Sequence, residues 1–215
     1  DALYETFTMV SDEARAKYHQ YQKNKEYDRY KGLTFWTPNI NIFRDPRWGR
    51  GMETYGEDPY LTERMGVAVV KGLQGDDPKY FKTHACAKHY AVAVLNGTDL
   101  ECGNSYKALI KALKEGKISE NDLDVSLRRL LKGRFELGMF DPDERVPYAQ
   151  IPYNVVESPE HVAQALEMAH KSMVLLKNKN NTLPLSKTIR KIAVVGPNAA
   201  DSTMLWANYN GFPTH

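Results

Sequence analysis

Apolar residues recur at helical spacing in several stretches of the chain, and polar or small residues mark the ends of these stretches. In the clearest case Asp58 and Pro59 supply an N-cap and a first-turn proline, and Gly75 ends the run. Ser119 and Asp122 have the spacing of a capping box and open another helix. These signals predict helices at residues 59–75, 105–116, 119–131 and 158–173.

Residues 12–30 are mostly polar, so the pattern there predicts a helix that faces solvent on most sides. Ser11 is the expected N-cap of this helix. Asp12 and Glu13 follow in its first turn, where negative charge interacts favourably with the helix dipole. We therefore expect the helix to begin just after Ser11.

Short runs rich in β-branched and aromatic residues alternate with the helices and predict strands. Near-alternation of polar and apolar residues at 39–43 indicates a short buried strand, and the Gly-, Pro- and charge-rich residues 44–59 predict a long loop after it. Strands that alternate with helices favour a parallel sheet. The predicted strands lie within residues 31–43, 80–90, 93–99 and 191–195.

The stretch KHYAVAVLNGTDLECG, residues 88–103, joins two predicted strands without a turn residue between them. Parallel strands need a crossover of about a dozen residues or more, and a hairpin needs a Gly, Asn or Asp turn. One continuous strand would exceed the usual length of about three to ten residues. We infer that a segment is missing from the chain near residues 89–95, between about His89 and Leu95.

The composition changes at residues 138–153, which hold three prolines and few apolar pairs. This change is typical of a linker between domains. A helix follows, and then the apolar residues 191–195 run into a Gly-Pro-Asn turn. The pattern predicts an α/β domain, a linker, and the first buried strand of a second α/β domain.

Composition narrows the function classes. The 215 residues are 42% hydrophobic, enough for a substantial core, and 29 basic against 27 acidic residues leave a net charge of +2. A net charge this small gives no overall electrostatic field that would attract nucleic acid. No apolar stretch approaches the roughly 20 residues that are needed to cross a membrane.

The sequence does not indicate a metal or nucleotide site. Cys86 and Cys102 have no metal-site spacing, so we expect two buried free thiols. VVGPNA lacks the glycine pattern of a nucleotide-binding turn, and we expect no metal and no organic cofactor.

Five segments, in order, resemble the signature segments of glycoside hydrolase family 3, in particular its β-glucosidases and β-xylosidases. They are RDPRWGRGMETYGEDPYL, KTHACAKHYAV, GTDLECG, LKGRFELGMFDP and VLLKNKNNTLPL. The resemblance implies an α/β fold in which a TIM-like (β/α) barrel is followed by an α/β sandwich domain, with the sugar bound between them. It also implies that a long piece of barrel separates the second and third segments in relatives.

Under this resemblance the chain holds a partial TIM-like barrel, a linker and the start of an α/β sandwich domain. Residues 1–137 correspond to the partial barrel, residues 138–186 to the linker and a connecting helix, and residues 187–215 to the first strand of the second domain. The chain opens without Met and closes without an obvious stop, so we expect both ends to be cut from a longer protein.

The resemblance assigns substrate binding to Arg50, Lys88 and His89. It places the nucleophilic Asp in the missing barrel piece and the acid/base Glu beyond His215, so no catalytic carboxylate is expected in this chain. Asp99 and Glu101 do not match the nucleophile motif. We expect Asp99 to order the turn after its strand instead.

Other interpretations compete with these assignments. Composition alone favours solvated or structural roles for the arginines at 47 and 50, and the motif reverses this only for Arg50. A lysine within an apolar strand is costly to bury unless it is paired, and Glu53 is the candidate partner of Lys88. Adjacent strand residues point to opposite faces, so we expect an irregular peptide at Lys88-His89 if both reach one ligand.

Aromatic and imidazole side chains have less support as ligands. We expect His84 to be a hydrogen-bonded core histidine. Trp36, Trp48 and Trp206 could stack on sugar rings, although barrel aromatics are more often core residues, and Trp48 is the strongest of the three.

The resemblance predicts a retaining exo-β-glycosidase, a β-glucosidase or β-xylosidase, that acts on oligosaccharides or small glycosides. The 215 residues alone should be inactive, and an open partial barrel favours homo-oligomers or domain swapping. A carbohydrate-binding pseudoenzyme and a structural or regulatory α/β module are the alternatives. LECG and NYNGFP favour the xylosidase branch, and polysaccharide degradation favours the periplasm or secretion.

Overall fold

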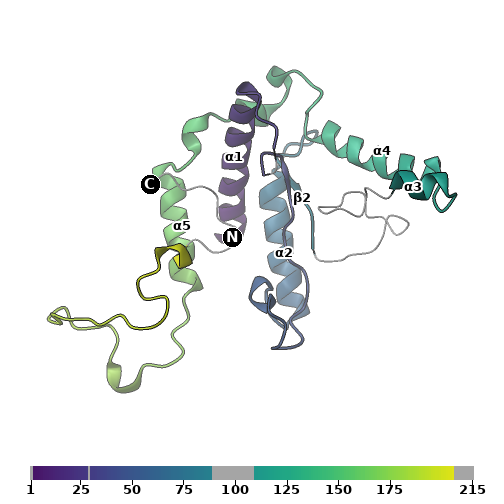
Figure 1. Ribbon diagram of the computed structural model, residues 1–215. Helices are drawn as coiled ribbons and strands as arrows, with labels where there is room; N and C mark the ends of the chain where they lie inside the picture. Colours follow the sequence, from purple (N-terminus) through teal and green to yellow (C-terminus); the bar gives the residue numbers. More distant parts are fainter. Residues whose placement is uncertain (1, 29, 89–108, 206–215) are drawn as a thin grey trace. The chain divides into compact units, whose positions relative to one another are not determined.

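The computed structural model describes residues 2–28, 30–88 and 109–205 (Figure 1). The chain divides into two compact units, residues 1–172 and 173–215, which are described separately below. This boundary falls inside the range 138–186 that the sequence predicts as linker and connecting helix. Among the described residues, no helix is both long and apolar enough to cross a membrane.

The first unit is built on two helices that lie side by side, α1 (Ala2–Lys23) and α2 (Pro59–Gln74) (Figure 1). The prediction that Ser11 caps a solvated helix is wrong, because α1 already begins at Ala2 and Ser11 is fully buried within it. The Ser11 hydroxyl contacts the carbonyl oxygens of Thr8, at 2.7 Å, and of Gly72 in α2, at 2.9 Å. Small residues at this crossing let the two helices approach closely.

The boundaries of α2 are those that the sequence predicts. The Asp58 carboxylate accepts a hydrogen bond from the backbone N–H of Tyr60, and Pro59 occupies the first helical position. Gly75, at φ 73°, closes the helix in a conformation that suits glycine. Local side-chain and backbone preferences are therefore sufficient to set both ends of α2.

The helix α2 connects two short parallel strands, β1 (Thr34–Phe35) and β2 (His84–Ala85). Thr34 pairs with His84 and Phe35 with Ala85, and a further parallel bridge joins Asn39 to Lys88. A strand, a helix and a parallel strand form the predicted α/β unit. The regular strands are shorter than predicted, and residues 39–43 contribute only the Asn39 bridge rather than a strand.

Besides α1 and α2, the described residues of the first unit form the α-helices α3 (Leu109–Lys114), α4 (Glu120–Glu136) and α5 (Pro159–Ser172). The predicted capping box at α4 is confirmed, since Ser119 and Asp122 each bond the backbone N–H of the other. The described residues contain only two paired strands, so the barrel stays an expectation while the α/β class is supported.

Arg15 links three parts of the first unit. Its guanidinium is buried and donates to the carbonyl oxygens of Lys82 at 2.5 Å, Phe81 at 2.7 Å and Leu137 at 2.9 Å. Lys82 leads into β2, and Leu137 caps the C-terminus of α4. The Lys82 ammonium is itself buried and lies 2.8 Å from a carboxylate oxygen of Asp12. The helix α1 thus fixes the segment that precedes β2.

The proline-rich segment that begins at residue 138 belongs to the first unit and packs against its other elements. It contains the 3-10 helices η4 (Asp143–Arg145), η5 (Pro147–Gln150) and η6 (Tyr153–Val155). Val146 and Tyr148 are buried with Tyr80 in one apolar cluster. The Tyr148 hydroxyl oxygen accepts hydrogen bonds from the backbone N–H groups of Asp76, at 3.0 Å, and Asp77, at 2.9 Å. The start of the segment is therefore part of the core.

The described part of the second unit, residues 173–205, contains the 3-10 helices η7 (Lys179–Asn181) and η8 (Ser202–Leu205) and no strand. Residues 191–195, predicted as a buried strand, are exposed and irregular. A strand is stable only when a neighbour satisfies its backbone N–H and C=O groups, and none of the described residues pairs with this stretch.

Two glycines of α2 allow a matched test of the helix crossing. A Cβ at Gly72 would lie 2.6 Å from the carbonyl oxygen of Tyr4, whereas a Cβ at Gly66 has its nearest neighbour at 3.6 Å. We expect Gly72→Ala to destabilise the protein by about 1–3 kcal/mol through overpacking. Gly66→Ala should be neutral or stabilising by up to about 1 kcal/mol, because alanine favours helix. Urea unfolding of both variants tests this, and equal stabilities would contradict the observed crossing.

Candidate functional site

The two segments that carry the predicted binding residues both follow the parallel strands. Residues 36–58 connect β1 to α2 and include Arg50, and Lys88 lies three residues after β2. Parallel strands end at the same edge of a sheet, where α/β proteins usually place their ligand sites. The bridge between Asn39 and Lys88 continues the pairing to this edge. The topology therefore brings the two segments together.

The loop after β1 has a defined turn at its centre, the 3-10 helix η1 (Gly51–Glu53). The Thr54 N–H donates to the Gly51 carbonyl at 3.1 Å, and the Thr54 hydroxyl donates to the same oxygen at 2.8 Å. A Cβ at Gly51 would collide with the Phe43 ring, so any larger residue there would force the ring to move. Arg50 and Glu53 are three positions apart in the sequence, and this turn brings their side chains into contact.

Arg50 and Lys88 meet at the carboxylate of Glu53. The Arg50 Nε donates to Glu53 Oε1 at 2.6 Å and its Nη2 to Oε2 at 2.7 Å, which is a two-point contact. The Lys88 ammonium lies 3.4 Å from Oε2 of the same carboxylate. The predicted pairing of Lys88 with Glu53 is confirmed. Lys88 and Glu53 are about one-fifth exposed and Arg50 nearly half exposed, so the group of three borders solvent.

The two cations stabilise the ionised form of the Glu53 carboxyl group. The hydrogen bonds from Arg50, with a smaller contribution from Lys88, lower the pKa of Glu53 from 4.5 to about 2. Because the folded-state pKa is depressed, these contacts contribute stability above pH 4.5 and lose it as the pH falls toward 2. Glu53 is therefore ionised at every pH at which most proteins are handled.

Several predicted residues lie outside the described ranges. His89, the third predicted binding residue, is one of them, and so are the Lys88-His89 peptide and the junction near residues 89–95. Asp99, Glu101, Cys102 and Trp206 also fall there. Their assignments stay predictions.

His84 is a packed histidine, as expected, but its contacts differ from the prediction. Its ring lies edge-on to Phe81 at 5.5 Å and against Gly133, where a Cβ would lie 2.7 Å from the imidazole. Its Nε2 makes no hydrogen bond within the described chain, and the nearest carboxylate oxygen, of Glu136, lies at 3.7 Å. Burial lowers the pKa of His84 despite the opposing effect of Glu136.

The other candidates take structural or surface positions. Arg47 forms an exposed ion pair with Asp45 at 2.6 Å, so the solvated interpretation suits it. Trp48 stacks on Phe43 with ring centroids 6.4 Å apart, and Trp36 is 44% exposed. Cys86 is a free and exposed thiol, so the expectation that it is buried is wrong. No group of metal-ligating side chains occurs in the part of the chain that the structure describes.

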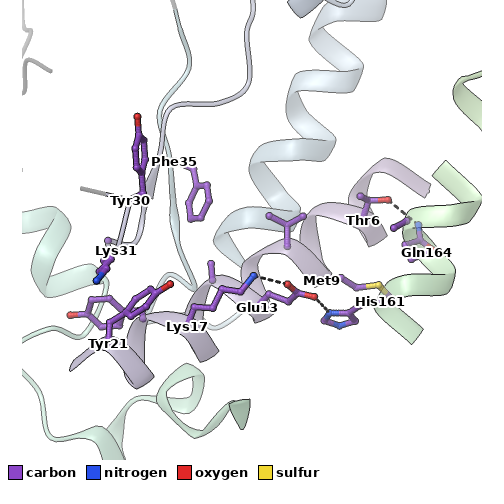
Figure 2. A pocket seen from close by; sticks show the side chains of 15 residues that line it. Thr6, Met9, Glu13, Lys17, Tyr21, Tyr30, Lys31, Phe35, His161 and Gln164 are labelled. Carbon is purple, nitrogen blue, oxygen red and sulfur yellow. Dashed lines mark hydrogen bonds and ion pairs between the residues drawn. The ribbon is translucent and has the colours of Figure 1, made fainter. Parts of the chain in front are cut away.

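A hollow of about 360 Å³ lies in the first unit, away from the group around Glu53, between α1, α5 and residues 30–35 (Figure 2). Glu13 lies at the wall of the hollow. Its carboxylate accepts a hydrogen bond from the Lys17 ammonium at 3.0 Å and is hydrogen-bonded to the His161 imidazole at 2.9 Å. Gln164 of α5 donates to the hydroxyl of Thr6 at 2.9 Å. These bonds dock α5 on α1, and no predicted binding residue lines the hollow.

Comparison with known families identifies both units. Residues 21–104 match the model of the glycosyl hydrolase family 3 N-terminal domain. Residues 173–215 match the model of the glycosyl hydrolase family 3 C-terminal domain. The second match begins at the residue where the second compact unit begins.

Similar proteins carry names from the same family. The chain is 37% identical to a xylan 1,4-β-xylosidase of Xylanibacter ruminicola and 30% identical to the probable β-D-xylosidase 7 of Arabidopsis thaliana. The alignments cover 99% and 98% of this chain but only 37% and 42% of those proteins. The chain thus spans less than half the length of these curated relatives.

Solved structures agree with this result. A family 3 exo-β-xylosidase in complex with a xylobiose aziridine probe superposes with a TM-score of 0.73 at 25% identity, over 87% of this chain and 37% of that one. A β-glucosidase from Listeria innocua has a TM-score of 0.59 at 22% identity, over 86% and 40%, which supports the fold. Two family models in their usual order, the xylosidase relatives and these structures lead to one conclusion: the chain belongs to glycoside hydrolase family 3.

Proposed function

We propose that this chain is part of a retaining exo-β-glycosidase in which Arg50, Lys88 and His89 bind hydroxyl groups of the terminal sugar. The observation that carries the proposal is the meeting of Arg50 and Lys88 at Glu53. The two cations come from separate loops, yet they lie at the edge of the sheet where such a site is expected. A guanidinium and an ammonium supply several N–H donors, which suit a ring that displays adjacent hydroxyls.

A β-linked xylose unit is the favoured substrate. The first relatives are named as xylosidases, and the solved structure that superposes with a TM-score of 0.73 is that of an exo-β-xylosidase. The LECG and NYNGFP segments point the same way. A β-glucoside is the second candidate because the family includes both activities.

The retaining mechanism requires two carboxyl groups about 5 Å apart, one as nucleophile and one as acid and base. Neither is assigned to this chain, and we propose that the nucleophile belongs to a barrel segment absent near residues 89–95. The alignment with the Xylanibacter xylosidase supports the absence of a segment, since its 318 positions exceed the 215 residues of the chain. The alignment includes 99% of this chain, so about one hundred positions of the xylosidase have no counterpart in it.

A carbohydrate-binding protein without turnover is the alternative that a specific observation favours. The described chain keeps the Arg50, Glu53 and Lys88 group intact although it contains no carboxylate that matches the nucleophile motif. Such a protein would bind a saccharide and leave it unchanged.

The chain has a feature that favours self-association. In the described sheet the outer edges of β1 and β2 are unpaired, and unpaired edges can pair with another chain.

Replacement of Lys88 tests the proposed binding role. We expect Lys88→Ala to weaken the affinity for xylobiose by about 10- to 100-fold, because hydrogen bonds from charged groups contribute about 1.5–3 kcal/mol. Isothermal titration calorimetry measures the affinity. Lys171→Ala, which removes an exposed lysine from α5, is the matched control and should bind as the unaltered protein does. Equal affinities for both variants would contradict the assignment.

Hydrolysis assays test whether this chain supplies its own catalytic carboxyl groups. We expect the 215-residue chain to bind xylobiose but to release no measurable nitrophenol from nitrophenyl β-xyloside or nitrophenyl β-glucoside, because the chain is proposed to lack the two carboxyl groups of the mechanism. Turnover by this chain, retained after exhaustive purification, would show that it supplies its own nucleophile and would overturn the proposed position of that residue.

A further inference from the structure

Glu53 has a position that the binding role of Arg50 and Lys88 does not by itself explain. Both of its carboxylate oxygens face cations, Oε1 the Arg50 Nε and Oε2 both the Arg50 Nη2 and the Lys88 ammonium. A carboxylate engaged in this way is poorly placed to bond a sugar. It is well placed to hold the two cations.

Glu53 has a rigid base for this task. It ends the η1 turn, and its N–H donates to the Arg50 carbonyl at 3.1 Å. Arg50 is more exposed than Glu53, and a long arginine side chain loses rotamer freedom when it is fixed. The two-point contact aligns the plane of the guanidinium with the carboxylate and therefore restricts its orientation.

Lys88 is anchored from the other side. Its N–H donates to the Pro38 carbonyl at 3.0 Å, and its own carbonyl accepts from the Ile40 N–H at 3.0 Å. These bonds fix the backbone, whereas the four-carbon side chain keeps several rotatable bonds. The contact with Glu53 restricts the ammonium and joins the end of the β2 segment to the loop after β1.

We propose that Glu53 is a positioning residue, which holds the Arg50 guanidinium and the Lys88 ammonium in the arrangement that binds a terminal sugar without bonding the sugar itself. The inference rests on the proposed function, because it assigns Glu53 a role in the same site. It goes beyond that function by predicting that the effects of Glu53 and Arg50 are coupled.

A double-mutant cycle tests the coupling. We expect Glu53→Gln, which keeps the shape and removes the charge, to weaken xylobiose binding about tenfold or more. The two effects should be less than additive in the pair Arg50→Ala with Glu53→Gln, since the part of the Glu53 effect that acts through Arg50 is already lost in Arg50→Ala and only the part that acts through Lys88 remains. Asp45→Asn is the matched control, because it breaks an exposed Asp–Arg pair in the same loop, and it should leave affinity within about twofold.

Unfolding measurements separate positioning from general stability. If Glu53→Gln keeps the urea midpoint of the unaltered protein and loses affinity, positioning is supported. If it is unstable, Glu53→Asp serves instead: it retains the charge on a shorter side chain and should show intermediate affinity. Full additivity of the Arg50 and Glu53 effects, or unchanged affinity of Glu53→Gln beside weak binding of Lys88→Ala, would overturn this inference and leave the proposed function standing. No binding by the unaltered chain would overturn both.

The titration of Glu53 provides a readout that needs no sugar. Its carboxyl carbon, followed by NMR, should titrate near pH 2 in the unaltered protein and move toward 4.5 in Arg50→Ala. The direction follows because removal of the guanidinium takes away the main stabilisation of the ionised form. An ordinary pKa in the unaltered protein would mean that the two-point contact is absent in solution, which would contradict the inference.

Discussion

The parallel pairing of β1 with β2 is the constraint on which the rest of the site depends. Because the strands run in the same direction, the loop after Phe35 and the segment after Ala85 leave the sheet at one edge. The connecting helix α2 is held by α1 through the small residues Ser11 and Gly72. Once this unit has formed, Arg50 and Lys88 are neighbours although 38 positions in the chain separate their numbers.

Two arginines of the same unit show how charge is used for different purposes. Arg15 is buried, and among the described residues its guanidinium donates to three carbonyl oxygens, one of them at the C-terminal end of α4, where the helix dipole favours a cation. Burial lowers the pKa of Arg15 to about 10, so it stays charged at neutral pH. Arg50 borders solvent and faces Glu53. The first arginine holds elements together, and the second lies at the edge of the sheet, where Glu53 fixes its guanidinium.

Local signals in the sequence predict local structure well. Asp58 with Gly75 sets the ends of α2, and Ser119 with Asp122 opens α4. The same logic fails at Ser11, because a serine followed by acidic residues resembles an N-cap even when the helix has begun earlier and the serine is buried against another helix. Signals for strands at residues 39–43 and 191–195 fail for a different reason, since a strand depends on a partner that sequence spacing cannot reveal.

The candidate site was predictable only in part. The cost of burying Lys88 pointed to a partner, and Glu53 is that partner. The two-point contact from Arg50 could not be foreseen, because it requires the η1 turn to place both side chains on one side. The assignment of His89 still depends on the family motif.

A direct test of the central claim is side-chain NMR of the chain during titration with xylobiose. The Arg50 Nε–H and Lys88 ammonium signals should shift together, with one saturation curve, because both groups contact the same sugar. Shifts confined to other residues, for example around the hollow between α1 and α5, with these two signals unchanged at saturation, would contradict a sugar site built on Arg50 and Lys88.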